Sequence, residues 1–401
     1  MTITNFDIAS NVKVQMWLPV LVINPFILGL SALGGADVLD GDLDPETNWD
    51  WVNVEAATVQ ADINTGGEIA DSLFFSPSPA ELNLTMQSFV FDPNANKSIR
   101  SGTKIRFMLD DGATQTILFN GLIDKIGVTY DPQGFNVIKV TAYDRYKSDA
   151  NARVNYDTTL MSPVYPLDVI YLLTLAVGAP LDIDSDQGTI KLPSEAITNN
   201  PTAGASIKKV LDAQLGIIWV DPTTGNYIFK NRPEPITGTP PTGIYTVGNN
   251  HPAVGESDPY HLCMSSIDAS ADSSQVVNSL KATLASDTDV NIVKTNQDSI
   301  DLYGNIANDV TINVLDETEL NTWAETAFSL SPTKIVDTVG TPAIDRVGTL
   351  THAAFMQPGE NIRVYYEKDD LAIIDYYQVI RVSHSVDVNN WMTELTLWRA
   401  F

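Results

Sequence analysis

Residues 102–107 read Gly-Thr-Lys-Ile-Arg-Phe and residues 359–364 read Gly-Glu-Asn-Ile-Arg-Val, so both carry Gly-x-x-Ile-Arg-apolar at an offset of 359 − 102 = 257. The same offset superimposes strand-like apolar residues further along both stretches. The matched pairs are Gly102 with Gly359, Ile105 with Ile362, Arg106 with Arg363, Ile138 with Leu395, and Val140 with Leu397. The sequence therefore predicts that 102–144 and 359–401 are two copies of one β unit, a structural rather than a catalytic device. The alternative is a chance likeness, because the sequences of β-strands resemble one another.

Strand patterns also surround the first copy. Apolar residues alternate with polar ones over much of the chain from Trp49 to about Arg153, which is typical of strands with one buried face. Asp110-Asp111-Gly112 predicts a hairpin turn after a strand at 105–109. Asp131-Pro132-Gln133-Gly134 predicts a second turn before a strand at 137–142.

The pattern changes in the middle of the chain. Residues 166–176 begin with proline and are followed by Gly178, which is typical of a helix. Residues 205–215 repeat the helical pattern and are followed by Gly216. A hairpin is predicted at 217–229, so about 155–232 forms a small α+β module, followed by a linker rich in proline and glycine at 233–260.

The patterns together predict a mainly β fold with a small α+β module, divided into three parts. The first part spans 1–152 and is a β domain. The second spans 153–236 and contains two helices and a hairpin. The third spans 237–401 and is a second β domain, interrupted by an inserted helical segment near 300–344 that includes a helix at 317–330.

A strongly apolar run extends from Val14 to Leu33 near the N-terminus. The charged residues before it are only Asp7 and Lys13, whereas a signal peptide has a basic segment there. A membrane helix would carry prolines and Asn24 in its middle. We therefore expect two buried strands, broken at Asn24-Pro25.

Composition excludes several classes of function. The chain has 23 Lys and Arg against 50 Asp and Glu, a net charge of 23 − 50 = −27. Without clusters of basic residues, stable nucleic-acid binding and attraction to an anionic membrane are both disfavoured. Cys263 is the only cysteine, so an internal disulfide and a Cys-x-x-Cys zinc site are excluded.

Motifs that would carry chemistry are weak. Two Asp-x-Asp-x-Asp runs lack the Gly and Glu of an EF-hand loop, so solvated acidic loops explain them better. These runs are Asp40-Gly-Asp42-Leu-Asp44 and Asp182-Ile-Asp184-Ser-Asp186. His384 is predicted to be a core or interface histidine, and His261 and Cys263 are too close in sequence for a catalytic pair. We therefore predict no catalytic, cofactor-binding or metal-binding residues, and no enzyme activity.

Three parts of the chain together resemble the tail-hub proteins of long-tailed bacteriophages, over most of residues 50–401. In the first, Gly-x-x-Ile-Arg is followed by Phe119-Asn-Gly-Leu-Ile123 and Val137-Ile-Lys-Val-Thr-Ala-Tyr-Asp144. In the middle, a helix precedes residues 215–221 and 225–230. The C-terminal part contains the segments 298–304, 358–364, 379–384 and 391–397. The first 48 residues lie outside the resemblance.

The resemblance implies two tube-type β domains per chain with inserted α/β hub domains. Three chains would form a pseudo-sixfold ring that closes the distal end of the tail tube. The expected partners are further copies of the chain, the ring of the distal tail protein, the tape measure protein, and tail-tip or receptor-binding proteins. The expected location is the distal tail tip of the virion, after assembly in the host cytoplasm.

A ring of three copies would carry 3 × 27 = 81 negative charges. Like charge repels DNA, so we expect DNA to pass through without stable binding and the inner face to be acidic or neutral. Two alternatives stay open. The chain could be a distal tail or receptor-binding adaptor protein, which would favour a hexamer, or a tail-associated glycan hydrolase, which needs a cleft lined by carboxylates of raised pKa.

Overall fold

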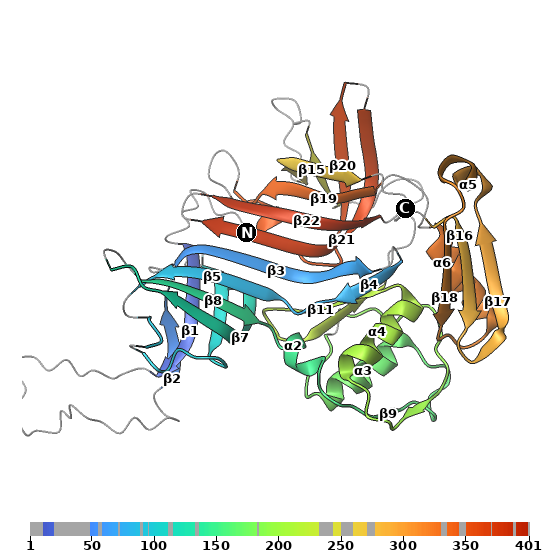
Figure 1. Cartoon of the computed structure of the whole chain (residues 1–401), viewed down its shortest axis with the longest axis horizontal. Coiled ribbons are helices and arrows are strands. Elements are labelled where there is room, and N and C mark those ends of the chain that lie inside the picture. Colours follow the sequence, from blue (N-terminus) through green and yellow to red (C-terminus); the bar gives the residue numbers. More distant parts are fainter. Residues whose placement is uncertain are drawn as a thin grey trace, which may run out of the picture.

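The alternating stretches form a fifteen-stranded sheet that dominates the computed structural model (Figure 1). The structure describes residues 11–19, 49–54, 58–70, 73–88, 91–94, 96–110, 115–132, 136–182, 184–231, 244–249, 260–270, 277–329, 335–344, 350–369, 371–387 and 390–399. The main fold-class prediction, a mainly β chain with a small α+β module, is confirmed.

The large sheet consists of two groups of five strands and their flanking strands. The first sheet half contains β3 (Thr58–Ala70), β5 (Glu81–Gln87), β8 (Val137–Tyr143), β7 (Gln115–Thr129) and β6 (Lys104–Asp110), in this spatial order. The second sheet half contains β15 (Ser266–Ser270), β19 (Ile335–Pro342), β22 (Trp391–Arg399), β21 (Leu371–Asp387) and β20 (Asn361–Lys368). Every neighbouring pair within each half is antiparallel, and β3 pairs with β21, so the two halves form one continuous sheet.

Shorter strands flank the two halves. β1 (Val12–Pro19) pairs with β6 and with β2 (Trp49–Asn53), and β4 (Phe74–Pro77) pairs with β3. β13 (Tyr245–Gly248) lies parallel to both β20 and β14 (His261–Cys263), so the predicted linker at 233–260 contributes a strand. A short 3₁₀ helix spans His352–Ala354.

The first half of the apolar N-terminal run forms β1, which confirms the first of its two predicted strands. The predicted break at Asn24-Pro25, the second strand and the acidic run at 40–44 lie outside the described residues. None of the described helices is long and apolar enough to span a membrane.

Alternation fixes which face of the sheet is buried. On β5, Leu82, Leu84 and Met86 are buried, whereas Asn83 and Thr85 between them are partly exposed. The same alternation on β8 buries Ile138 and Val140. Each fully buried aliphatic side chain of this kind contributes roughly 1.5–3 kcal/mol, so the alternation determines the register of the sheet.

The α+β module forms largely as predicted. It contains α2 (Tyr146–Asp149), β9 (Tyr156–Asp157), α3 (Pro166–Ala176), β10 (Ala196–Ile197), α4 (Ala203–Gln214), β11 (Ile217–Val220) and β12 (Tyr227–Lys230). Pro166 occupies the first turn of α3, and Thr202 caps α4 by accepting a hydrogen bond from the Ala205 N–H. Both helices and the hairpin are therefore confirmed.

The insertion in the third part has different bounds from those predicted. A separate sheet of β16 (Ser279–Leu284), β17 (Asp287–Thr295) and β18 (Ala307–Ile312) carries α5 (Gln297–Tyr303) and α6 (Glu317–Ser329). It therefore begins well before residue 300, and β19 already belongs to the large sheet. Alternation identifies a strand but does not indicate which sheet it joins, so the sequence placed this boundary wrongly.

The insertion packs on the α+β module at the far end of the molecule from β7 (Figure 1). The Trp323 indole N–H donates to the Asp212 carbonyl at 2.9 Å, and its ring stacks on Phe74 with the centroids 6.2 Å apart. One apolar cluster therefore joins residues of α3, α4, α6 and the tip of the β3–β4 hairpin.

Candidate assembly surface

The matched glycines occupy the same place in the two sheet halves. Gly102 and Gly359 precede β6 and β20, and their φ angles are +88° and +91°. The Gly102 N–H donates to the Ile123 carbonyl at 2.7 Å, and the Gly359 N–H donates to the Val379 carbonyl at 2.7 Å. The Ile123 N–H and the Val379 N–H each return a bond of 2.8 Å, to the carbonyls of residues 103 and 360. Glycine is favoured at both positions because other residues rarely adopt a positive φ.

The offset between structurally equivalent residues decreases along the chain. These hydrogen bonds match Ile123 to Val379, an offset of 379 − 123 = 256. Val140 lies opposite Ile126 as Leu395 lies opposite Val382, an offset of 395 − 140 = 255. Structural register therefore pairs Val140 with Leu395, two residues from the predicted partner Leu397.

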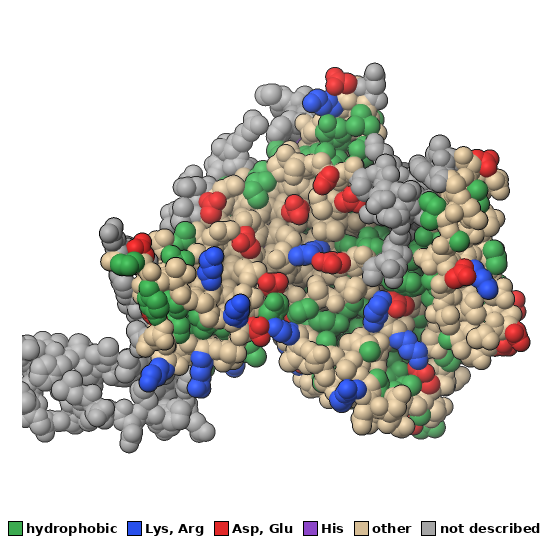
Figure 2. All heavy atoms as spheres, in the orientation of Figure 1, with side chains coloured by type: hydrophobic (Ala, Val, Ile, Leu, Met, Phe, Trp, Pro, Cys, Tyr) green, Lys and Arg blue, Asp and Glu red, His purple; other side chains and the backbone are tan. Residues whose placement is uncertain are grey.

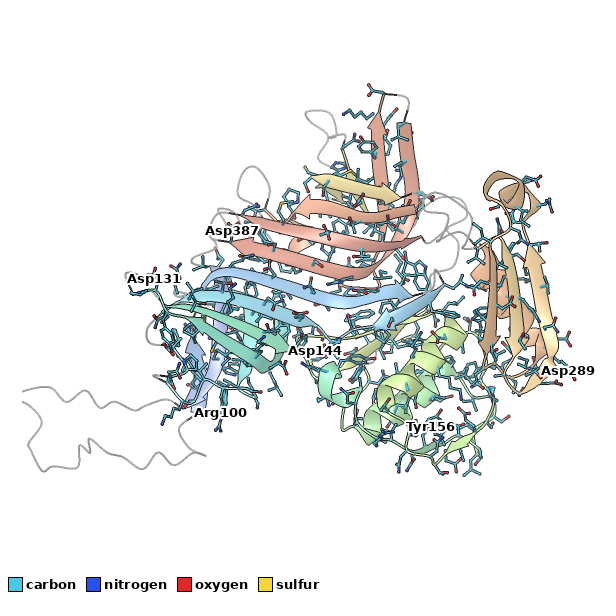
Figure 3. All side chains as sticks on the ribbon, in the orientation of Figure 1. Arg100, Asp131, Asp144, Tyr156, Asp289 and Asp387 are labelled. Carbon is cyan, nitrogen blue, oxygen red and sulfur yellow. The ribbon has the colours of Figure 1, made fainter. Side chains whose placement is uncertain are left out.

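The two-residue drift has a simple origin. One residue comes from a bulge in β7 at Leu118, because β21 pairs with β20 without a bulge. The other comes from the connection between strands two and three, which is one residue shorter in the second half. A shift of two residues keeps every side chain on the same face, so alternation alone does not detect it. Asp131 and Asp387, 256 residues apart, accordingly lie at the same end of the sheet (Figure 3).

Six of the ten matched residues lie in two apolar cores, three in each. Ile105, Ile138 and Val140 are buried in the cluster of the first half, and Ile362, Leu395 and Leu397 in that of the second half. The two arginines differ in surroundings: Arg106 donates to the Gln15 Oε1 from Nε at 2.8 Å, whereas the Nε of Arg363 is buried without a hydrogen-bond partner.

The pairing of β3 with β21 joins the two halves, and we call it the β3–β21 interface. It extends from Arg381 opposite Gly66 to Asp387 opposite Gln60. Gly66 has a φ of +114°, and a Cβ there would lie 2.1 Å from the Ile380 carbonyl oxygen. Only glycine therefore permits the close approach at which β3 meets β21.

Two side-chain contacts lie across this interface on the polar face of the sheet. The Ser385 hydroxyl donates to the Asp62 carboxylate at 2.7 Å, and these two residues are directly opposite each other. The Arg381 Nη1 donates to the Glu68 carboxylate at 2.9 Å. Acidic and basic side chains are interspersed over the visible face of the large sheet (Figure 2).

His384 lies on the buried side of the same interface. Its Nδ1 is 3.0 Å from the Thr393 hydroxyl, and burial lowers its pKa to about 4. The imidazole is therefore neutral at physiological pH, which agrees with a core histidine. His261 and Cys263 lie on the short strand β14.

Asp144 is a described carboxyl group with a raised pKa. Burial raises the pKa of Asp144 to about 7, and its carboxylate accepts the Tyr146 N–H at 3.0 Å at the start of the α+β module (Figure 3). A small cavity of about 50 Å³ near Trp219 and His384 is lined by no acidic residue among those described. The second acidic run folds against β12, where Asp186 accepts the Asn231 N–H at 2.8 Å. No group of three or more His, Cys, Asp or Glu side chains gathers for a metal ion in the described part of the chain.

Comparison with known proteins identifies the fold. No protein-family model and no curated protein matches the sequence. The tail protein from Neisseria meningitidis MC58 is similar in structure, with a TM-score of 0.60, 13% identity and 96% of both chains covered. The 43 kDa tail protein of prophage MuSo2 from Shewanella oneidensis has a TM-score of 0.57 and 10% identity, over 88% of this chain and 95% of that one. Prophage tail protein gp18 from Listeria monocytogenes EGD-e has a TM-score of 0.52 and 10% identity, over 96% of this chain and 94% of that one. The chain thus has the fold of these tail proteins.

Proposed function

We propose that this chain is a structural hub protein of a bacteriophage tail. Three copies form a pseudo-sixfold ring that closes the distal end of the tail tube and anchors the tail-tip or receptor-binding proteins. The ring neither catalyses a reaction nor carries a cofactor. It sits in the virion, at the distal tail tip, after assembly in the host cytoplasm.

One observation carries this proposal: each chain holds two sheet halves with the same strand order, joined edge to edge. Three chains therefore supply six similar units, the number needed to match a sixfold tube. The full-length likeness in fold to tail proteins supports the same role. The adjoining rings would be those of the distal tail protein and, within the tube, the end of the tape measure protein.

The mixed charge on the sheet suits a conduit for DNA. Lys125, Lys139 and Arg381 are spread over separate strands, with acidic residues such as Asp62 and Glu81 among them. Dispersed cations do not build the clustered phosphate contacts that hold DNA. DNA would accordingly pass without stable binding.

Native mass spectrometry of the purified chain at micromolar concentration tests the proposal. A particle of three times the 43.7 kDa chain mass is expected. Six copies would instead favour the distal tail or adaptor role, and a stable monomer that forms no ring in virions would contradict the hub. The location is tested by electron microscopy of virions labelled with an antibody to this chain.

A further inference from the structure

We infer that neighbouring copies join by pairing β15 of one chain with the second half of β7 of the next, in the register of the β3–β21 interface. This inference rests on the proposed ring.

Two strand edges at equivalent places have no strand partner among the described residues. In the first half the order β3, β5, β8, β7 corresponds to β15, β19, β22, β21 in the second half (Figure 1). β3 pairs with β5 on one side and β21 on the other, whereas β15 pairs only with β19 among the described residues. β21 is flanked by β22 and β3 over 381–386, whereas β7 beyond Leu122 pairs only with β8 in the described part of the chain.

Register then gives the opposing residues. The offset of 256 places Thr129 of β7 where Ser385 of β21 stands. Ala61 lies opposite Leu84 as Ile267 lies opposite Val339, so Asp268 stands where Asp62 of β3 stands. The expected pairs between chains are Asp268 with Thr129, Ile267 with Tyr130, and Ala269 with Val128.

The chemistry of the internal interface recurs at these positions. Inside the chain, the Ser385 hydroxyl donates to the Asp62 carboxylate. Between chains, the Thr129 hydroxyl would donate to the Asp268 carboxylate, and both residues are exposed in the single chain. Lys125 occupies the place of Arg381, so the basic residue is retained as well. The hydroxyl–carboxylate pair is therefore matched on both strands, and the second contact is matched on β7 alone.

The exposure of apolar residues at the end of β7 also supports a strand partner at this edge. Tyr130 is 55% exposed, whereas Val386 at the equivalent position is 3% exposed because β3 covers it. Ile126 and Val128 are half-buried, and their equivalents Val382 and His384 are buried. A second copy of β15 on this edge would give β7 the cover that β3 gives β21, and would remove two exposed strand edges.

Disulfide trapping tests this register. The background variant is Cys263→Ser, and the test variant adds Asp268→Cys and Thr129→Cys. Directly opposite residues of an antiparallel pair have Cβ atoms about 4.5–5.5 Å apart, near disulfide distance. Mild oxidation should convert more than half of the chains to covalent dimers and trimers on a denaturing, non-reducing gel.

Matched controls define the result. Asp268→Cys with Lys125→Cys shifts one partner by four residues, about 13 Å, and should give little cross-linking. Asp62→Cys with Ser385→Cys should close a disulfide within one chain and leave a monomer band. The unmodified assembly gives a second test, which does not depend on the folding of any variant. Within 125–130, the amides that do not bond to β8 should exchange slowly in the assembly.

The outcomes separate the inference from the proposed function. A trimer by mass in which the internal pair oxidises but Asp268 with Thr129 does not overturns this pairing and leaves the hub intact. A trimer in which the amides of 125–130 that do not bond to β8 exchange freely has the same meaning. A monomer by mass contradicts the hub itself. Equal cross-linking of the shifted and direct pairs would also overturn the register.

Discussion

β6 and β20 are the equivalent outer strands of the two sheet halves, but the strands that pair with their outer sides differ in direction. β1 runs antiparallel to β6, with Met16 opposite Ile105. β13 runs parallel to β20, with Tyr245 opposite Ile362. Both isoleucines are fully buried in spite of this difference. The two halves therefore repeat the same buried core strands but differ in the strands added at their edges.

Polar residues at these edges show the same division. The Arg106 guanidinium lies 4.2 Å from the Trp51 ring and donates to Gln15, which ties β6 to β1 and β2. The Arg363 Nε has no hydrogen-bond partner among the described residues, and its guanidinium lies 5.6 Å from the ring of Tyr365 on its own strand. Near the end of the second hairpin, Leu371 and Ile374 are 44% and 48% exposed. The two halves therefore have equivalent cores, but their edges can bind different partners.

The largest expected effect concerns the shared core. Ile105→Ala and Ile362→Ala should each lower the free energy of unfolding by about 2–5 kcal/mol, because each leaves a cavity in a closed cluster. If the halves are equivalent, the two losses agree within about 1 kcal/mol, by urea denaturation. A loss at one site several times that at the other would break the equivalence.

The strands themselves were predictable because alternation and turn residues are local signals. Leu82, Leu84 and Met86 predict a half-buried strand without knowledge of its neighbours. α3 was predictable for the same reason, since Pro166 begins it and Gly178 follows its end. The repeat was visible because Gly102 and Gly359 have to adopt the same positive φ.

Pairing between distant strands was not predictable. Nothing in β3 specifies β21 as its neighbour, and the contact between Asp62 and Ser385 spans 323 residues. The role of Thr129 and Asp268 was missed for this reason, because their meaning comes only from register. A single sequence carries no signal for such pairs, although the matched position of Lys125 and Arg381 could have been noticed once the offset was corrected.

Asp144 gives the first half a dependence on pH. The equivalent position in the second half is Arg399, so no matching carboxyl stands there. Since burial raises the pKa of Asp144 from 3.8 to about 7, the folded state holds a proton that the unfolded state releases between these values. This contribution is fully present below about pH 4 and is lost as pH rises through 7, by at most about 4 kcal/mol.

Asp144→Asn should remove this loss. Urea denaturation at pH 5 and pH 8 should show wild type losing stability relative to the variant as pH rises. Asp289→Asn, at an exposed carboxyl of the insertion, is the matched control and should follow wild type (Figure 3). Parallel curves for wild type and Asp144→Asn would contradict the assignment.

Substitution by alanine should destabilise the protein less at Gly102 than at Gly359. Gly102→Ala meets no atom within 4 Å and should cost about 1–2 kcal/mol, for the positive φ alone. Gly359→Ala brings its Cβ to 2.8 Å from the Trp219 ring and should cost about 2–4 kcal/mol, because overpacking is added. Thermal and urea unfolding of both variants give the comparison. Equal losses of stability in the two variants would mean that the Trp219 side chain moves aside without a measurable energetic penalty.

The arginines should give the smallest effect and the sharpest test of edge specialisation. Arg106→Ala removes a charged hydrogen bond to Gln15 and the contact with Trp51, so a loss of about 1–3 kcal/mol is expected. Arg363→Ala removes a group whose Nε has no hydrogen-bond partner, and its loss should be below about 1 kcal/mol. Gln15→Ala combined with Arg106→Ala should cost less than the sum of the single variants, because the two residues share one interaction. If instead both arginines cost the same and Gln15 adds independently, the two edges are equivalent and the specialisation lies elsewhere.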